Sequence, residues 1–182
     1  MKTIALYGGS FDPPHIAHEA IVKALCELDF LDEIIVMPTY LNPFKKSFTT
    51  PAQVRLKWLQ KIFAPYKKVT VSSFEVDQEK KVPTIESVYH LLQKYETLYL
   101  VIGADNLKTL HKWHRYDELK ECVHFIVATR NDIKVPNDFI QLKIDEEISS
   151  SDLREHLDMS KLPKACAQDI ARYYKEHNAN KN

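Results

Sequence analysis

The sequence contains few cysteines and has no excess of charge of either sign. Only three cysteines occur among 182 residues, and an odd number of widely spaced thiols does not suit a disulfide framework. The 25 basic residues balance 25 acidic ones, whereas nucleic-acid binding normally needs a basic excess to neutralise phosphate. We therefore expect a cytoplasmic protein with reduced thiols and without a nucleic-acid partner.

Long apolar runs are also missing. No stretch approaches the ~20 apolar residues of a membrane span, and the first apolar run is too short for a signal peptide. Hydrophobic residues nevertheless make up 45% of the sequence, which is enough for one well-filled core. We expect a single domain over residues 1–182 with no membrane segment, and the composition leaves formation of a homo-oligomer open.

Short apolar segments alternate with longer segments of helical period. We predict six strands, most of them almost continuously apolar: Ile4–Tyr7, Ile34–Met37, Val69–Val71, Leu98–Ile102, His124–Ala128 and Phe139–Ile144. Such strands are typical of a parallel sheet that is buried on both sides. The alternation predicts an α/β fold, a doubly wound Rossmann-like parallel sheet with helices on both faces, in which ligands bind at the carboxyl ends of the strands.

The sequence also predicts a loop and the helix start that follows it. Residues 40–48 have no clear period, and we expect a mobile loop there. The run Thr49-Thr50-Pro51 predicts the start of a helix, with a threonine hydroxyl as cap and proline in the first turn.

Glycine is scarce in this sequence. The only three are Gly8, Gly9 and Gly103, and each directly follows a predicted strand. Turns elsewhere are left to Asn, Asp, Pro and Ser. Glycine is thus confined to places where the backbone must approach another group closely or adopt a positive φ.

The glycine pair opens a segment that reads GGSFDPPHIAH, residues 8–18. The glycines let backbone amides face a phosphate, and a helix should begin near Ile16 with its positive end in the same crevice. His15 and His18 then share one face at that helix start. Each can donate to phosphate oxygens, and an imidazolium can neutralise charge on a leaving group. The alternatives are two core or capping histidines, or a zinc site that lacks a third ligand.

A second polar segment reads ISSSDLR, residues 148–154. Successive serines before a helical run satisfy free amides of the helix and can offer hydroxyls to phosphate. Arg154 lies about one turn further and can present its guanidinium to the same anion. Taken alone, the serines are more often only a helix cap.

A third segment, GADNLKTLHKW, residues 103–113, follows a predicted strand directly. Asp105 is well placed there to accept ribose hydroxyls, and Trp113 can stack on an aromatic ring. Either residue alone would be read as a helix cap or a core tryptophan.

Together the three segments resemble the GxFxPxHxGH, GADxxxxLxxW and ISSTxxR motifs of the bacterial nicotinate-nucleotide adenylyltransferases, in the same order along the chain. Two positions depart mildly, Ala17 for glycine and Ser151 for threonine. The resemblance implies transfer of the adenylyl group of ATP to nicotinate mononucleotide, which yields nicotinate adenine dinucleotide and pyrophosphate in NAD biosynthesis. It also implies Mg²⁺ bound with ATP and no metal site made of protein side chains.

The resemblance assigns roles to individual residues. Catalytic roles fall to His15, His18 and Arg154. Binding of ATP falls to Gly8, Gly9, Ser10, Phe11, His15, His18, Lys45, Gly103, Asp105, Ser149, Ser150, Ser151 and Arg154. Binding of nicotinate mononucleotide falls to Thr84, Trp113 and Arg130. Of these, Lys45 and Arg130 could be ordinary exposed side chains and Thr84 only an N-cap, and Phe44 stands where the family has a histidine.

Three other functions remain to be separated from this one. A phosphopantetheine adenylyltransferase has similar first and last motifs but lacks the Gly-Ala-Asp…Trp segment. A cytidylyltransferase would prefer CTP to ATP. A nucleotide-binding regulator would bind ATP without releasing pyrophosphate, although such a protein need not keep the contacts to a leaving group that His18 and Arg154 provide.

Overall fold

The computed structural model describes residues 2–46, 49–129, 133–146 and 148–179. Six strands form one parallel sheet in the order β3-β2-β1-β4-β5-β6. Their bounds are Thr3–Gly9 (β1), Glu33–Pro38 (β2), Val69–Val71 (β3), Thr97–Gly103 (β4), His124–Thr129 (β5) and Ile140–Lys143 (β6). The predicted fold class is confirmed, and all six predicted strands are present. Several extend beyond their apolar run because polar end residues such as Thr3 and Thr97 still pair along the backbone.

The connections between strands are helical. The α-helices are Ile16–Cys26 (α1), Ala52–Phe63 (α2), Phe74–Asp77 (α3), Thr84–Leu92 (α4), Tyr116–Cys122 (α5), Ser150–Glu155 (α6) and Ala167–Ala179 (α7). Short 3₁₀ turns are Ala104–Asn106 (η1), Leu110–Lys112 (η2) and Met159–Lys161 (η3). Within the described ranges, no helix combines the length and apolar character that crossing a membrane takes.

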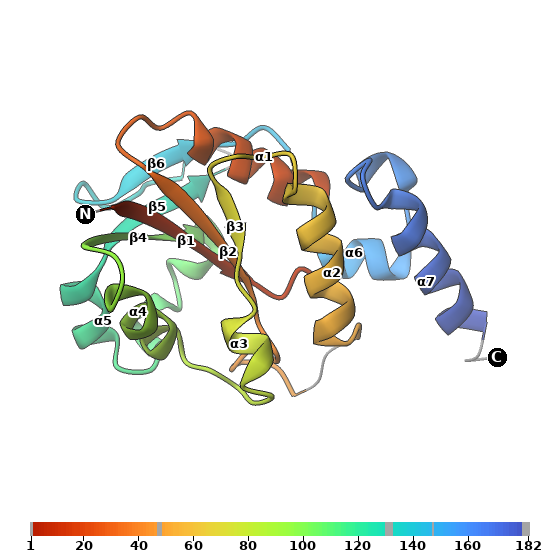
Figure 1. Cartoon of the computed structure of the whole chain (residues 1–182), viewed down its shortest axis with the longest axis horizontal. Helices are drawn as coiled ribbons and strands as arrows, with labels where there is room; N and C mark the ends of the chain where they lie inside the picture. The colour runs from red at the N-terminus through yellow and green to blue at the C-terminus, as the bar shows by residue number, and fades with distance from the viewer. Residues whose placement is uncertain (1, 47–48, 130–132, 147, 180–182) are drawn as a thin grey trace.

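Side-chain alternation along the strands divides the core into two clusters. In β1, Ala5 and Tyr7 belong to the cluster beneath α1 and α2, whereas Ile4 and Leu6 belong to the cluster beneath α4 and α5. Successive residues of a strand point to opposite faces, so both faces of the sheet are buried. Figure 1 shows these helix pairs on opposite sides of the sheet. Burial on both faces explains why the strands are continuously apolar.

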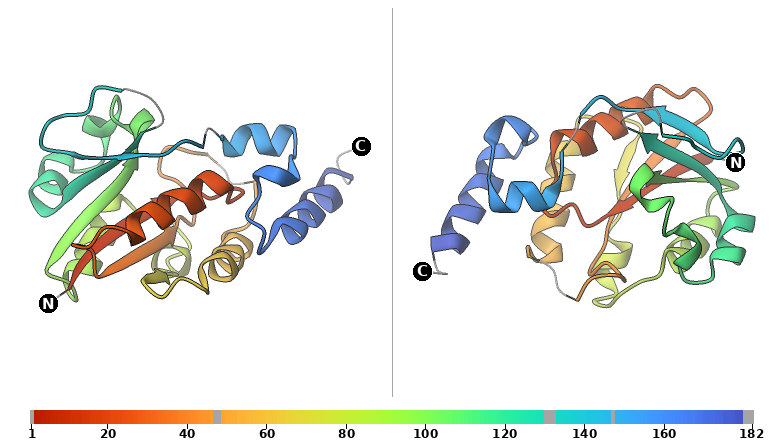
Figure 2. Two further views of the ribbon diagram at one scale, coloured as in Figure 1. Left: turned by 90° about the horizontal axis from the view of Figure 1, so that it is seen from above. Right: turned by 180° about the vertical axis from the view of Figure 1, so that it is seen from behind.

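The end of the chain packs against α2. Ile170 and Tyr174 of α7 are buried in the same cluster as Leu59 of α2. Figures 1 and 2 show α6, η3 and α7 at one end of the molecule, beside α2 and away from the sheet. The final helix therefore completes the core through α2.

The predicted cap of α2 is wrong in its detail. The N-cap residue is Pro51, and it has no side-chain cap hydrogen bond. The hydroxyl of Thr50 instead bonds to the hydroxyl of Tyr174, with 2.9 Å between the oxygens. A tertiary partner from α7 has taken the place of the local one.

Glu75 is a buried carboxyl group between α3 and α4. It is 7% exposed, and Ser87 Oγ donates to its Oε1 at 2.6 Å. Burial raises the pKa of Glu75 from 4.5 to about 7, although the Ser87 hydrogen bond opposes the shift. Because the folded protein holds this proton more tightly than the unfolded chain does, ionisation of Glu75 lowers the free energy of unfolding as pH rises from 4.5 to about 7.

We predict that Glu75→Gln increases the free energy of unfolding more at about pH 8 than at about pH 5, by up to roughly 3 kcal/mol. Glutamine still accepts the Ser87 hydrogen bond but has no charge to bury. Urea denaturation of both proteins at the two pH values measures the difference. Glu121→Gln, on an exposed position of α5, is the control and should show no such pH dependence. An equal effect of Glu75→Gln at both pH values would contradict the prediction.

Candidate active site

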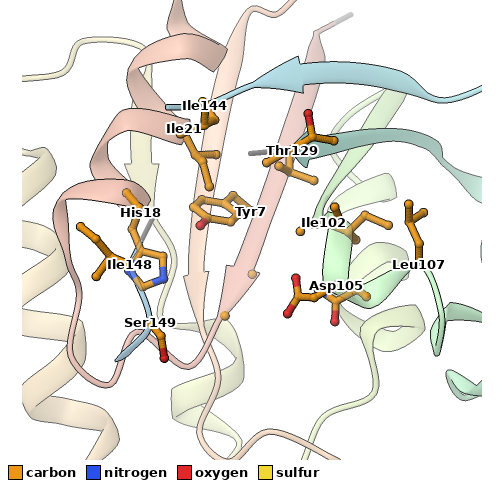
Figure 3. A pocket seen from close by; sticks show the side chains of 18 of the residues that line it. Tyr7, His18, Ile21, Ile102, Asp105, Leu107, Thr129, Ile144, Ile148 and Ser149 are labelled. Atoms are coloured by element: carbon orange, nitrogen blue, oxygen red, sulfur yellow. The ribbon is translucent and has the colours of Figure 1, made fainter. Parts of the chain in front are cut away.

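A cavity of about 1070 Å³ opens at the carboxyl ends of β1 and β4. Small-molecule sites commonly enclose about 300–1000 Å³, so this one is at the large end of that range. Its wall contains residues of all three sequence motifs: Gly8, Gly9, Ser10, Phe11, His15, His18, Gly103, Asp105, Trp113 and Ser149. In Figure 3, His18 and Ser149 lie on one side and Asp105 on the other. The structure thus brings together segments that are far apart in sequence.

The loop after β1 is shaped by Phe11 rather than by glycine torsion. None of the three glycines has a positive φ, whereas Phe11 has a φ of 48°. Its ring is buried, packs edge-on against Tyr7 and His18, and lies 3.3 Å from where a Cβ on Gly9 would stand. The absence of a side chain at position 9 makes room for this ring. Of the two uses of glycine predicted from the sequence, close approach is the one observed.

The two motif histidines lock one another in place at the start of α1. Their rings stack with centroids 3.6 Å apart, and the backbone N–H of His15 donates to Nδ1 of His18 at 3.1 Å. An Nδ1 that accepts a hydrogen bond is not protonated, so the ring proton of His18 lies on Nε2. His18 can therefore act as a neutral donor. That an imidazolium neutralises charge on a leaving group stays a prediction.

The motif after β4 places a carboxylate at the cavity. Asp105 lies in η1, whose N-cap is Gly103, so Asp105 is not the cap of this turn. A Cβ on Gly103 would stand 2.6 Å from Oδ1 of Asp105. Glycine at 103 thus leaves the carboxylate its position. Trp113 is half-buried against the cluster beneath α4 and α5 and also lines the cavity, so it serves the core and the site at once.

The serine segment packs against the loop after β1. Ser149 caps α6 by accepting from the backbone N–H of Asp152, so the interpretation of the serines as a helix cap holds for this residue. The Oγ of Ser149 is 2.6 Å from the Oγ of Ser151. Ser150 Oγ donates to the carbonyl of Pro13 at 2.9 Å. Arg154 donates to the carbonyl of Asp12. Only Ser149 of the three serines lines the cavity. Through their hydrogen bonds to Pro13 and Asp12, Ser150 and Arg154 hold the loop after β1 in place.

A further cation, Lys45, lies beside Ser10. The Nζ of Lys45 is 3.5 Å from Ser10 Oγ. Burial lowers the pKa of Lys45, and the neighbouring charge of Arg154 lowers it further, while Asp12 raises it. Lys45 and Arg154 therefore converge on the loop after β1 and form an electropositive side of the site. Phe44, in contrast, is 65% exposed.

Not every predicted contact lines the cavity. Lys45, Ser150, Ser151 and Arg154 lie beside it, against the loop after β1, and are not among its lining residues. Thr84 is the first residue of α4, after the N-cap Pro83, so it is not an N-cap, and it is not among the residues that line the cavity. Arg130 lies outside the described residues.

Sequence reasoning missed Arg55 and Asp12, the most buried charged pair near the site. Arg55 is 1% exposed and Asp12 is 4% exposed. A signal for Arg55 was present, because it lies three residues after Ala52 and four before Leu59, on the buried stripe of α2. Further cavity residues outside the motifs include Ile21, Thr129, Lys134 and Ile144.

The polar groups around the loop after β1 are mainly hydroxyls, imidazoles and cations. Among the described residues, no group of three or more His, Cys, Asp or Glu side chains could hold a metal ion. Such a donor set suits an anion, or a metal ion that arrives already bound to phosphate.

The chain is similar to known proteins over almost its whole length. The model of the cytidylyltransferase-like family matches residues 6–156. The chain is 58% identical to the probable nicotinate-nucleotide adenylyltransferase of Sulfurimonas denitrificans, over 97% of both chains. It is 46% identical to the protein of the same name from Campylobacter fetus, over 97% of this chain and 98% of that one. The nicotinic acid mononucleotide adenylyltransferase of Plasmodium falciparum, solved in complex with NaAD, shares the fold with a TM-score of 0.78 at 23% identity, covering 96% and 98% of the two chains.

We predict that Gly103→Ala displaces the Asp105 carboxylate without unfolding the protein. Gly103 has φ −75° and ψ 153°, which alanine adopts freely, so stability should be unchanged or raised by up to about 1 kcal/mol. A crystal structure of the variant should show a different Asp105 rotamer. Gly8→Ala is the control, since its Cβ would meet its nearest neighbour, the carbonyl oxygen of Met37, at 3.7 Å. An unmoved Asp105 would refute this account of Gly103.

Proposed function

This chain belongs to the cytidylyltransferase-like family and, within it, to the nicotinate-nucleotide adenylyltransferases, and we propose that it transfers the adenylyl group of ATP to nicotinate mononucleotide. The products are nicotinate adenine dinucleotide and pyrophosphate, as in NAD biosynthesis. The observation that carries the proposal is the single cavity in which His18 and Ser149 face Asp105, with Trp113 in the same wall. One end suits phosphates, and the other suits a ribose and an aromatic ring.

The proposed reaction is a direct in-line displacement. A phosphate oxygen of nicotinate mononucleotide attacks the α-phosphorus of ATP and forms the new P–O bond. The bond to the bridging oxygen breaks, and pyrophosphate leaves with the electron pair. Because the attacking oxygen is already ionised, no general base is needed. Positioning and neutralisation of charge supply the rate enhancement.

We assign the neutralisation of the charge on the departing pyrophosphate to His18, Arg154 and Lys45. His18 donates from Nε2, the nitrogen that carries the proton when Nδ1 accepts from the backbone of His15. Arg154 has one nitrogen on the carbonyl of Asp12 and further donors for an anion. Lys45 lies beside Ser10. The remaining triphosphate contacts fall to backbone and hydroxyl groups, namely those of Gly8, Gly9, Ser10, Phe11, Ser149, Ser150 and Ser151, together with His15.

The nucleosides occupy the other parts of the cavity in this proposal. Asp105 accepts hydroxyls of the adenylyl ribose, with Gly103 allowing its approach. Trp113 stacks on the pyridine ring, and Thr84 and Arg130 contact the mononucleotide. Mg²⁺ would enter with ATP and would supply further neutralisation of charge when bound. The cytoplasm is the proposed compartment, supported by three free cysteines, Cys26, Cys122 and Cys166.

The test is pyrophosphate release from Mg²⁺-ATP with three acceptors in parallel. Nicotinate mononucleotide should give release well above nicotinamide mononucleotide, and phosphopantetheine should give none. Release with phosphopantetheine alone would mean that the segment from Gly103 to Trp113 has another role. Release from CTP in preference to ATP would indicate a cytidylyltransferase, and ATP binding without release would indicate a regulator.

We predict that His18→Ala lowers kcat by about 10²- to 10³-fold, the usual cost of one donor to developing negative charge. The dissociation constant for ATP should change much less, because the charge that His18 meets develops only in the transition state. Steady-state kinetics and calorimetric titration of ATP separate the two quantities. His177→Ala, at an exposed position of α7, is the control. A near-normal kcat in His18→Ala would remove His18 from the mechanism.

A further inference from the structure

The last helix reaches the phosphate loop through one buried hydroxyl. Tyr174 of α7 is 4% exposed. Its hydroxyl donates to Oδ1 of Asp12 at 3.2 Å and lies 2.9 Å from Oγ1 of Thr50. A phenol has a single proton, so Thr50 donates to Tyr174 and Tyr174 donates to Asp12. This chain of hydrogen bonds joins residues that are 162 positions apart in sequence.

Asp12 connects Tyr174 to two parts of the phosphate site, the Thr49–Thr50 backbone and Arg154. Its carboxylate accepts the backbone N–H groups of Thr49 and Thr50 at 3.0 and 3.1 Å. These residues stand where the segment that carries Lys45 returns to α2. The carbonyl of Asp12 accepts from Arg154. One buried residue therefore fixes both the Lys45 segment and the guanidinium of Arg154.

Arg55 closes the same frame from the other side. Its Nε donates to the carbonyl of Thr50 at 2.9 Å, and one terminal nitrogen donates to the carbonyls of Ser10 and Thr39 at 2.6 and 2.8 Å. The other terminal nitrogen donates to the carbonyl of Tyr40 at 2.9 Å. The Lys45 segment is thus held at its start by Arg55 and at its end by Asp12.

We propose that Tyr174 is a positioning residue for the triphosphate of ATP, which it serves by holding Asp12 and, through Asp12, Arg154 and the segment of Lys45. The inference rests on the proposed function in that it takes the anion to be ATP. Tyr174 lies outside residues 6–156, the part of the chain that the family model matches. In this proposal the C-terminal helix contributes to the nucleotide site through Tyr174, as well as to the core.

Removal of this hydroxyl tests the proposal with little change of volume. In Tyr174→Phe, Asp12 keeps its two backbone donors but loses the third, and Thr50 loses its acceptor. We expect ATP to bind more weakly by about threefold to tenfold, within the range for net loss of one ordinary hydrogen bond. The KM for nicotinate mononucleotide should stay within about twofold of wild type. Calorimetric titration of ATP and steady-state kinetics give these values.

The chain supplies a matched control at the next position. Tyr173 packs on Trp58 and stacks on His177, and Tyr173→Phe removes a hydroxyl from the same helix but leaves the hydrogen bonds of the Asp12 carboxylate with Thr49, Thr50 and Tyr174 in place. It should leave ATP affinity at the wild-type value. Thr50→Val removes the donor to Tyr174 but leaves the bond from Tyr174 to Asp12, so it should also bind ATP almost normally.

Several outcomes would overturn the proposal. ATP affinity of Tyr174→Phe within about twofold of wild type would do so, as would an equal loss in Tyr173→Phe or Thr50→Val. A lower melting temperature with unchanged ATP affinity would show a purely structural role. If the wild-type chain fails to use nicotinate mononucleotide, the proposed function fails, but the calorimetric comparison still decides the role of Tyr174.

Discussion

The position of β1 in the sheet determines where the ligand site lies. β1 pairs with β2 on one side and with β4 on the other. The helix that follows β1 covers one face, and the turns and helix that follow β4 cover the opposite face. The two connections therefore diverge, and a crevice opens between the loop at Gly8 and the loop at Gly103. A ligand site at this reversal of strand order is a consequence of topology.

Topology opens the crevice but does not make its phosphate end rigid. The segments on that side, residues 10–13 and 39–46, have no regular structure, and their carbonyl groups lack partners in the sheet. A buried guanidinium with donors in a fixed fork can satisfy several carbonyls at once. Arg55 does this for the carbonyl groups of Ser10, Thr39 and Tyr40, and it also donates to that of Thr50. Burial lowers the pKa of Arg55, and the nearby charge of Asp12 opposes that shift.

What the sequence could predict follows from the range of the forces involved. Continuous apolar strands report burial on both faces, so the sheet was predictable, and so were the loops that glycine marks. The hydrogen bonds of Asp12 with Thr49, Thr50 and Tyr174 were not, because they join residues 37 to 162 positions apart. The burial of Arg55 was not predicted, because charged side chains are usually exposed, and only its place on the apolar stripe of α2 indicated otherwise.

The anchoring of the Lys45 segment also explains why a departure from the family motif at position 44 is compatible with the site. Phe44 has an exposed ring, and its backbone N–H bonds to Asn42. Its side chain therefore does not set the path of the segment, which Arg55 and Asp12 fix at its two ends. A change of residue type between two fixed ends alters one contact and leaves the neighbouring Lys45 beside Ser10. Ala17, a second departure, is buried in the cavity wall at 5% exposure, where a single methyl group adds packing without obstructing the crevice.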